Sequence, residues 1–391
     1  MKKYISQIGK QKYPPLLIRP DLVRNLRAIQ TKAVQGEDAR LTFGELLQSA
    51  LQLEFATVNP YLSAAFSIKN DNREIYELIQ RVAQEEMLHM TVVANLMNAI
   101  GIAPDILDVI PDYPFDLDVL DPSITINLSS LSFDLVEDLF MRIETPEDPT
   151  EYPSWKVGME ADEELPKTVG QFYQEIIELI NSDVIPDLFE NAERDVYKQI
   201  EVNPNFREIK YINNDDDHTY PLNEDIDFVI KDKETAVRHL TWIVSGGEGS
   251  DPSNPLNDEG LPGHYYRFES ILKEKYLVKD KSGFSFSGGD LPFSQAGVHE
   301  FDGNAKVEDY ADDERVERHM QRFNESYTDM INNLQIAFNC LSPEQEQQSK
   351  EAYDASIGIM RNMPTKATAI VQAAEGSSIK AGIPFQYLPS A

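Results

Sequence analysis

The stretch from Ile75 to Ile100 constrains the fold of this chain more than any other. Apolar positions recur there in alternating steps of four and three residues, the pattern of an amphipathic helix packed in a bundle. Two positions of the stripe, Glu86 and His89, are ionisable where Val or Leu would be expected. The pattern therefore predicts a buried helix over about 72–100 with a carboxylate and an imidazole on its inward side. The stripe consists of Ile75, Ile79, Val82, Glu86, His89, Val93, Leu96 and Ile100.

Composition sets broad limits on the partners of the chain. Hydrophobic residues make up 41% of the 391 residues, which is enough for a sizeable core. The net charge of −32 repels nucleic acid and anionic membranes, so we expect neither as a partner. The single cysteine, Cys340, excludes a disulfide within one chain and fits a reducing compartment. The N-terminal residues lack the apolar core of a signal peptide, and no apolar run has the length of a membrane span, so we expect a cytoplasmic protein.

Further helices are predicted along the rest of the chain. The first, over 41–68, carries Leu47, Leu51, Glu54, Val58 and Tyr61 in register, with a kink expected at Pro60. It should lie antiparallel to the helix over 72–100, which ends at Gly101. The other predicted helices begin near Thr168 and cover 233–249, a resumption from 264, 312–340 and 343–373.

Irregular segments separate these helices. Residues 102–166 are rich in proline and form a crossover with one short amphipathic helix, "SFDLVEDLFMRIE". Residues 200–232 are acidic and are predicted to be an irregular excursion, and 250–262 to be a loop. We therefore expect one compact, mainly α domain. It would comprise an arm over 1–40, a bundle with inserted crossover loops over 41–280, and a C-terminal helical extension over 281–391.

The buried ionisable residues point to a metal site. Glu86 and His89 lie one helical turn apart and can reach a common point. A buried carboxylate costs several kcal/mol unless hydrogen bonds, protonation or a cation compensate for it. Glu54 occupies an equivalent inward position in the neighbouring helix, and Glu175 is the candidate acid of the helix from Thr168.

The last predicted ligands lie around the 250–262 loop. Glu248 closes the helix over 233–249, but Asp251 stands where a histidine would complete a Glu-x-x-His pair. We expect the inserted loop to return His264 to a position beside Glu248. One Glu from each of two helices and a Glu-x-x-His from each of two others form the ligand set of di-iron carboxylate bundles. The predicted metal ligands are therefore Glu54, Glu86, His89, Glu175, Glu248 and His264.

Other interpretations of single residues remain open. A one-residue error in helix phase would exchange Glu85 for Glu86, or Glu178 for Glu175. His239 lies one turn before Trp242 and is interpreted as a packing or capping residue rather than a ligand. Four residues are expected either to pack or, if they lie beside a metal, to bind substrate: Tyr61, Tyr265, Tyr266 and Arg267.

With these residues assembled, the chain resembles the ferritin-like domain of the iminophenyl-pyruvate dimer synthase family of violacein and indolocarbazole biosynthesis. The resemblance implies a four-helix ferritin-like bundle, long loop insertions, and metal ligands at the six positions named above. The family's named reaction is an oxidative coupling of two imino acids derived from aromatic amino acids, although this chain lacks the additional domain of the violacein enzyme. The matching stretches include "ALQLEFATVNPYLSAAFSI", "VAQEEMLHMTVVANLMNAIG", "LFMRIETPE", "TVGQFYQEI", "AVRHLTWIVSGGEG" and "HYYRF".

Three functions are compatible with the sequence. The first is a non-haem oxidase or oxygenase that holds two iron ions per chain, or manganese, and uses dioxygen or peroxide on a small, amino-acid-derived molecule. The second is a ferroxidase and iron store, which would need little beyond the bundle. The third is a metal-free helical interaction protein. The sequence leaves open whether copies of the chain form a homo-oligomer.

Overall fold

The structure is a computed structural model, and it describes most of the chain. The described residues are 29, 37–117, 124–146, 168–194, 197–202, 208–213, 216–221, 227–248, 254–257, 260–280, 283–375 and 380–389. The expected N-terminal arm therefore lies almost entirely outside the described residues.

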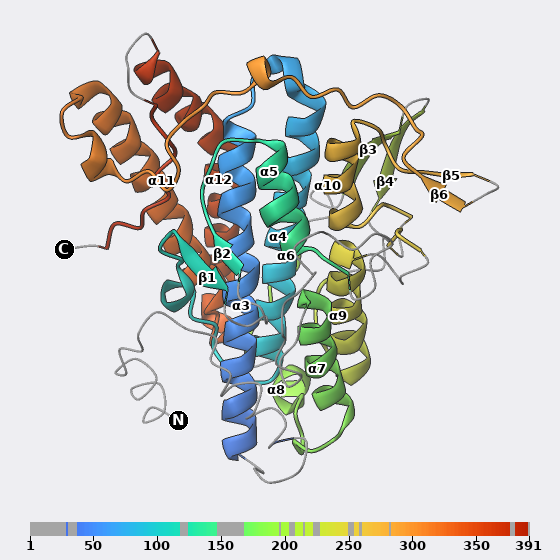
Figure 1. The fold of residues 1–391 in the computed structure, drawn as a ribbon. Helices are drawn as coiled ribbons and strands as arrows, with labels where there is room; N and C mark the ends of the chain where they lie inside the picture. Colours follow the sequence, from blue (N-terminus) through green and yellow to red (C-terminus); the bar gives the residue numbers. More distant parts are fainter. Residues whose placement is uncertain are drawn as a thin grey trace.

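Two long helices form the centre of the molecule (Figure 1). They are α3 (Glu37–Phe66) and α4 (Arg73–Ala99), connected through the short 3-10 helix η1 (Asn70–Asn72). The expected pair is confirmed, with α3 starting four residues earlier than predicted. Every residue of the predicted α4 stripe is buried, and Gly101 follows the helix with a φ of 79°. A positive φ of this size favours glycine. The helix end predicted at Gly101 therefore agrees with the observed end of α4.

Helix α3 continues through Pro60 because another residue takes over the freed backbone acceptor. A proline has no N–H, so the carbonyl of Ala56, four residues earlier, loses its helical donor. The Tyr113 hydroxyl donates a hydrogen bond of 2.9 Å to this carbonyl from the crossover segment. The crossover thus stabilises α3 at its one proline inside the helix.

The other two positions of the bundle are each filled by two shorter helices placed end to end (Figure 1). One contains the helical segment 133–143 and then α7 (Val169–Asn181). The other contains α9 (Lys233–Glu248) and then α10 (His264–Lys273). The predicted cap of α7 is confirmed, because the Thr168 hydroxyl accepts a hydrogen bond of 3.1 Å from the Gln171 amide. Both interruptions occur at the same level of the bundle, which is where the site lies.

The crossover contains the predicted short helix and a small hairpin. The hairpin pairs β1 (Phe115–Leu117) with β2 (Ile124–Ile126) in antiparallel register. The helix comprises α5 (Phe133–Leu135), a π-helical turn η3 (Val136–Phe140) and α6 (Met141–Ile143). A π-turn widens the helix by one residue per turn and often marks a functional site.

The expectation of an irregular excursion over 200–232 is wrong for its middle part. Two antiparallel strands are found there, β3 (Glu208–Asn213) and β4 (Asp216–Pro221). The acidic run suggested a loop, but the alternation of Glu208, Ile209, Lys210 and Tyr211 is the period-two pattern of a strand. A third antiparallel pair is formed by β5 (Val278–Asp280) and β6 (Gly283–Ser285).

The two predicted C-terminal helices form a hairpin against the side of α3 and α4 away from α9 (Figure 1). They are α11 (Glu314–Phe338) and α12 (Glu346–Ala374). Hydrogen bonds join them to the bundle, from Asn59 to the Tyr327 hydroxyl at 2.8 Å and between the Thr91 and Tyr353 hydroxyls at 3.3 Å. The shorter elements are η2 (Leu107–Val109), α8 (Glu190–Arg194), η6 (Gln295–Gly297), η7 (Val307–Tyr310) and η8 (Pro343–Gln345). Among the helices that the structure describes, none has the length and apolar character to cross a membrane.

Candidate metal centre

Five buried ionisable side chains meet inside the bundle, in two groups that share one residue. Glu54 of α3 joins Glu86 and His89 of α4 in the first group. Glu86 also belongs to the second group, with Glu144, which follows α6, and His264, the first residue of α10. Within each group the potential ligand atoms all lie within 4.8 Å of one another. Each group could hold one metal ion.

The two carboxylate oxygens of Glu86 face different histidines. Its Oε2 lies 3.6 Å from Nδ1 of His89, and its Oε1 lies 2.8 Å from Nδ1 of His264. The remaining carboxylates flank the outer sides, with Glu54 Oε2 3.4 Å from His89 Nδ1 and Glu144 Oε2 3.5 Å from His264 Nδ1. Both histidines therefore present the same ring nitrogen to the carboxylates, and Glu86 has the position of a bridging ligand.

Two of these atoms lack the hydrogen bonds that burial requires. Glu86 Oε1 and His264 Nδ1 are buried, face each other at 2.8 Å, and have no hydrogen-bond partner among the described residues. Buried polar groups are normally satisfied, so this pair needs either a proton on His264 Nδ1 or a cation. When His264 is neutral, a cation between the two atoms would accept both lone pairs. Three carboxylates and two imidazoles are a donor set suited to iron or manganese, so the residues fit such an ion.

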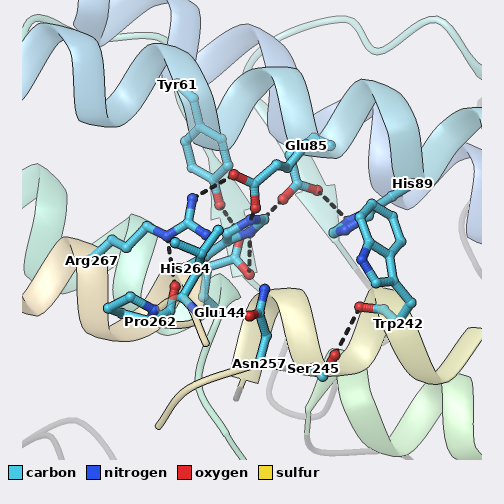
Figure 2. A network of polar contacts seen from close by, with 12 residues as sticks. Tyr61, Glu85, His89, Glu144, Trp242, Ser245, Asn257, Pro262, His264 and Arg267 are labelled. Atoms are coloured by element: carbon cyan, nitrogen blue, oxygen red, sulfur yellow. Dashed lines mark hydrogen bonds and ion pairs between the residues drawn. The ribbon is translucent and has the colours of Figure 1, made fainter. Parts of the chain in front are cut away.

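An outer pair of residues fixes the orientation of His264 (Figure 2). His264 Nε2 lies 3.0 Å from Glu85 Oε2, while Arg267 Nη1 donates a hydrogen bond of 2.5 Å to Glu85 Oε1. Arg267 Nε also donates to the carbonyl of Pro262 at 2.6 Å, which ties the loop before α10 to α4. We call this pair the Glu85–Arg267 clamp. Because Nε2 is occupied, only Nδ1 of His264 remains for the centre.

Hydroxyl groups hold the three carboxylates from outside. The Tyr61 hydroxyl donates to Glu144 Oε1 at 2.6 Å (Figure 2), and the Tyr173 hydroxyl donates to Glu54 Oε1. Thr57 donates to Glu86 Oε2 at 3.2 Å. Burial, together with the neighbouring carboxylates, raises the pKa of both tyrosines well above its usual value, so both stay protonated as donors.

Without a cation, the centre holds protons on its histidines. Burial alone would lower the pKa of His89, but Glu86 and Glu54 raise it to about 9. Burial also opposes the charge of His264, yet Glu144, Glu85 and Glu86 raise its pKa well above the usual value. Burial raises the pKa of Glu54 to about 7, so this carboxyl is partly protonated near neutral pH.

Metal binding should therefore release protons. A histidine ligand must be neutral, and the metal-free His89, with a pKa of about 9, is protonated at pH 7.5. We expect roughly two protons released per chain when both groups are filled, and an affinity that rises with pH between 6 and 9. Anaerobic titration with Mn²⁺ by calorimetry, in buffers of different ionisation enthalpy, measures this number. A binding enthalpy that is the same in all buffers would contradict the protonation states described.

Two glycines let α9 approach the centre closely. A Cβ on Gly247 would lie 2.9 Å from Glu144 Oε2, and one on Gly246 would lie 3.2 Å from His89 Nε2. Between the helices remains a cavity of about 20 Å³, lined by Glu54, Glu86, His89 and Glu144. This volume is enough for about one water-sized molecule.

Replacing Gly247 by alanine should displace the Glu144 carboxylate. We expect Gly247→Ala to weaken Mn²⁺ binding at the Glu144 and His264 group by at least about tenfold. The expected loss is steric, because alanine at a helical position otherwise stabilises a protein by about 0.5–1 kcal/mol relative to glycine. Gly358→Ala in α12 is the matched control, since its Cβ would meet nothing within 4 Å. Equal Mn²⁺ affinities of the two variants would show that Gly247 does not shape the site.

The structure brings together four of the six predicted ligands. Glu54, Glu86, His89 and His264 lie in the two groups. Glu175 is half-buried on α7 and belongs to neither group, because the side chain that α7 directs to the centre is Tyr173. The side chain of Glu248 lies outside the described part of the chain.

Glu144 is the residue that sequence reasoning missed. It follows the predicted short helix in "LFMRIE", where Phe140 and Ile143 are buried beside it. An acid at the end of such a buried face was the available signal. A crossover predicted over 102–166 does not by itself place this face at the centre of the bundle.

The remaining candidates have other surroundings. Glu85 is buried as well as Glu86, whereas Glu178 is exposed. His239 is buried against the Phe228 ring, with 5.9 Å between ring centres, and belongs to neither group, as expected for a packing residue. Tyr265 and Tyr266 are buried, pack edge to face against each other and do not line the cavity.

Comparison with known proteins agrees with this arrangement. A family model described as Ferritin-like matches residues 47–273, more than half of the chain. The chain belongs to the ferritin-like family. Its matched region contains all five residues of the two groups.

One solved structure shares the ferritin-like fold over nearly the whole length. It is a ferritin-like protein from Caulobacter vibrioides, 18% identical, with a TM-score of 0.50. The similarity covers 88% of this chain and 97% of that chain, so it includes elements outside the matched bundle. No curated protein matches the sequence.

Proposed function

We propose that this chain is an oxidase or oxygenase with two metal ions, most simply iron, that uses dioxygen or peroxide to oxidise a small organic molecule. The observation that carries the proposal is the position of the buried Glu86, whose two carboxylate oxygens face His89 and His264. Two iron ions bound there would activate dioxygen or peroxide, and this oxidant supplies the oxidising equivalents for the reaction. Manganese is the second candidate because it accepts the same oxygen and imidazole ligands.

The chain's own residues prepare the centre for a small oxidant. Leu53, Ile143 and Ile243 line the cavity with apolar surface and exclude bulk water, while the outer hydroxyls hold the carboxylates in place. The cavity wall is half-exposed at Val169 and Val244. The side between α7 and α9 is therefore where we place the approach of oxidant and substrate.

The substrate class in this proposal comes from the resemblance to iminophenyl-pyruvate dimer synthase. Aromatic 2-imino acids are accordingly the first compounds to test. An amino-acid oxidase generates them in place, and mass spectrometry detects a coupled or oxygenated product. Parallel reactions with and without catalase distinguish dioxygen from peroxide as the oxidant. Product formation should require iron-loaded wild-type protein and be lost in Glu86→Gln.

Iron uptake and oxygen consumption of the same protein distinguish an enzyme from an iron store. We expect iron uptake to stop near two ions per chain, without a mineral. Continued uptake into a mineral core, with no organic compound altering oxygen consumption, would contradict the proposed oxidase and favour storage.

A further inference from the structure

A second pocket lies on the other side of α4 from the metal centre. It has a volume of about 220 Å³ and lies between α3, α4 and α12. We call it the α12 pocket. Leu62 of α3, Leu88 of α4 and Met360 of α12 provide apolar lining, and the side chains of Arg81 and Arg361 also line it. An apolar pocket with a few charged groups is the usual form of a small-molecule site.

Arg81 is the unusual residue of this pocket. Its side chain is half-buried, yet the guanidinium makes no hydrogen bond or ion pair with any described residue. Burial lowers the pKa of Arg81; Glu77 opposes this effect, and the buried Arg267 adds to it. Glu77 is already paired with Arg73 at 2.9 Å. No nitrogen of this guanidinium is among the fully buried atoms of the described residues, so it can donate hydrogen bonds to water or to an anion that enters the pocket.

The charged residues around the α12 pocket also favour an anionic ligand. Glu85 is the one carboxylate residue that lines it within the described chain, and this carboxylate is neutralised by Arg267. Arg267 Nη2 is itself buried without a hydrogen-bond partner among the described residues. The lining therefore contains two arginines and a single carboxylate that is already paired, in a chain whose net charge is −32.

We infer that the α12 pocket binds a small amphiphilic organic anion, with its anionic group at Arg81 and Arg361 and its apolar body against Leu62, Leu88 and Met360. A guanidinium binds carboxylate or phosphate through paired hydrogen bonds, and two guanidiniums in one pocket select strongly for an anionic head. The apolar lining selects for an attached chain or ring. The site does not depend on the proposed oxidase function, because no metal ligand lines it.

Binding of octanoate to the purified, metal-free chain tests this inference. Calorimetry should show saturable binding of one octanoate per chain. Octanol, which keeps the chain but lacks the charge, should bind at least about tenfold more weakly. Octyl phosphate is measured in parallel to distinguish a carboxylate site from a phosphate site.

Two pocket variants and one control complete the test. Arg81→Gln should weaken octanoate binding at least about tenfold, and Leu62→Trp should block it by filling the pocket. Arg322→Gln, at an exposed arginine of α11, should bind as the wild type does. Thermal unfolding and Mn²⁺ content confirm that each variant remains folded with an intact metal centre. Absence of saturable binding to the wild type, equal binding of octanol, or unchanged binding in Arg81→Gln would each overturn the inference.

Discussion

Glu86→Ala is expected to reduce bound iron from about two ions per chain to almost none. Glu86 belongs to both groups, because one of its carboxylate oxygens faces His89 and the other faces His264. The alanine variant therefore removes a potential ligand from both metal positions. Anaerobic loading with ferrous iron, removal of free metal and elemental analysis measure the content directly.

A control from α7 makes this result specific. Glu178→Ala removes an exposed acid from the same bundle and should keep the wild-type metal content. His89→Ala, in contrast, should lose mainly the ion of its own group. Retention of both ions by Glu86→Ala would refute the bridging position assigned to this residue.

Arg267→Met is expected to destabilise the metal-free protein by about 3–5 kcal/mol. Removing one partner of a buried ion pair destabilises a protein because the other charge loses its main compensation, and here only His264 would remain beside the Glu85 carboxylate. Here the remaining charge is Glu85, whose pKa is held at about 2 against the effect of burial, chiefly by Arg267 and also by His264. Urea denaturation at pH 7 measures the change in the free energy of unfolding.

The double variant Arg267→Met/Glu85→Gln separates the charge effect from lost packing. It should regain a large part of the loss, because no unpaired carboxylate remains. Arg322→Met, at an exposed position of α11, should change stability by less than about 0.5 kcal/mol. A loss of similar size in Arg267→Met and in the double variant would show that the clamp acts by packing alone.

The long helices could be predicted because local periodicity determines them. The α4 stripe repeats at helical spacing, so the inward direction of Glu86 and His89 follows from the sequence without any knowledge of the partners. The same holds for the start of α10 at His264, since the loop before it is marked by prolines and glycines.

The rest of the site depends on tertiary relations that periodicity does not contain. Glu144 reaches the centre because a crossover and a π-turn return the chain to the bundle. On α7, Tyr173 and Glu175 are two residues apart and lie on nearly opposite sides of the helix, so the prediction assigned the wrong side of α7 to the centre. Tyr173 faces Glu54 as a hydrogen-bond donor, so the helix contributes a supporting group where a ligand was expected.

Anomalous diffraction at the iron edge, from crystals grown after anaerobic loading with ferrous iron, tests the central claim most directly. We expect two iron peaks per chain, one between Glu54, Glu86 and His89 and the other between Glu86, Glu144 and His264. Crystals without iron at either position, or with iron bound only at the protein surface, would contradict this expectation.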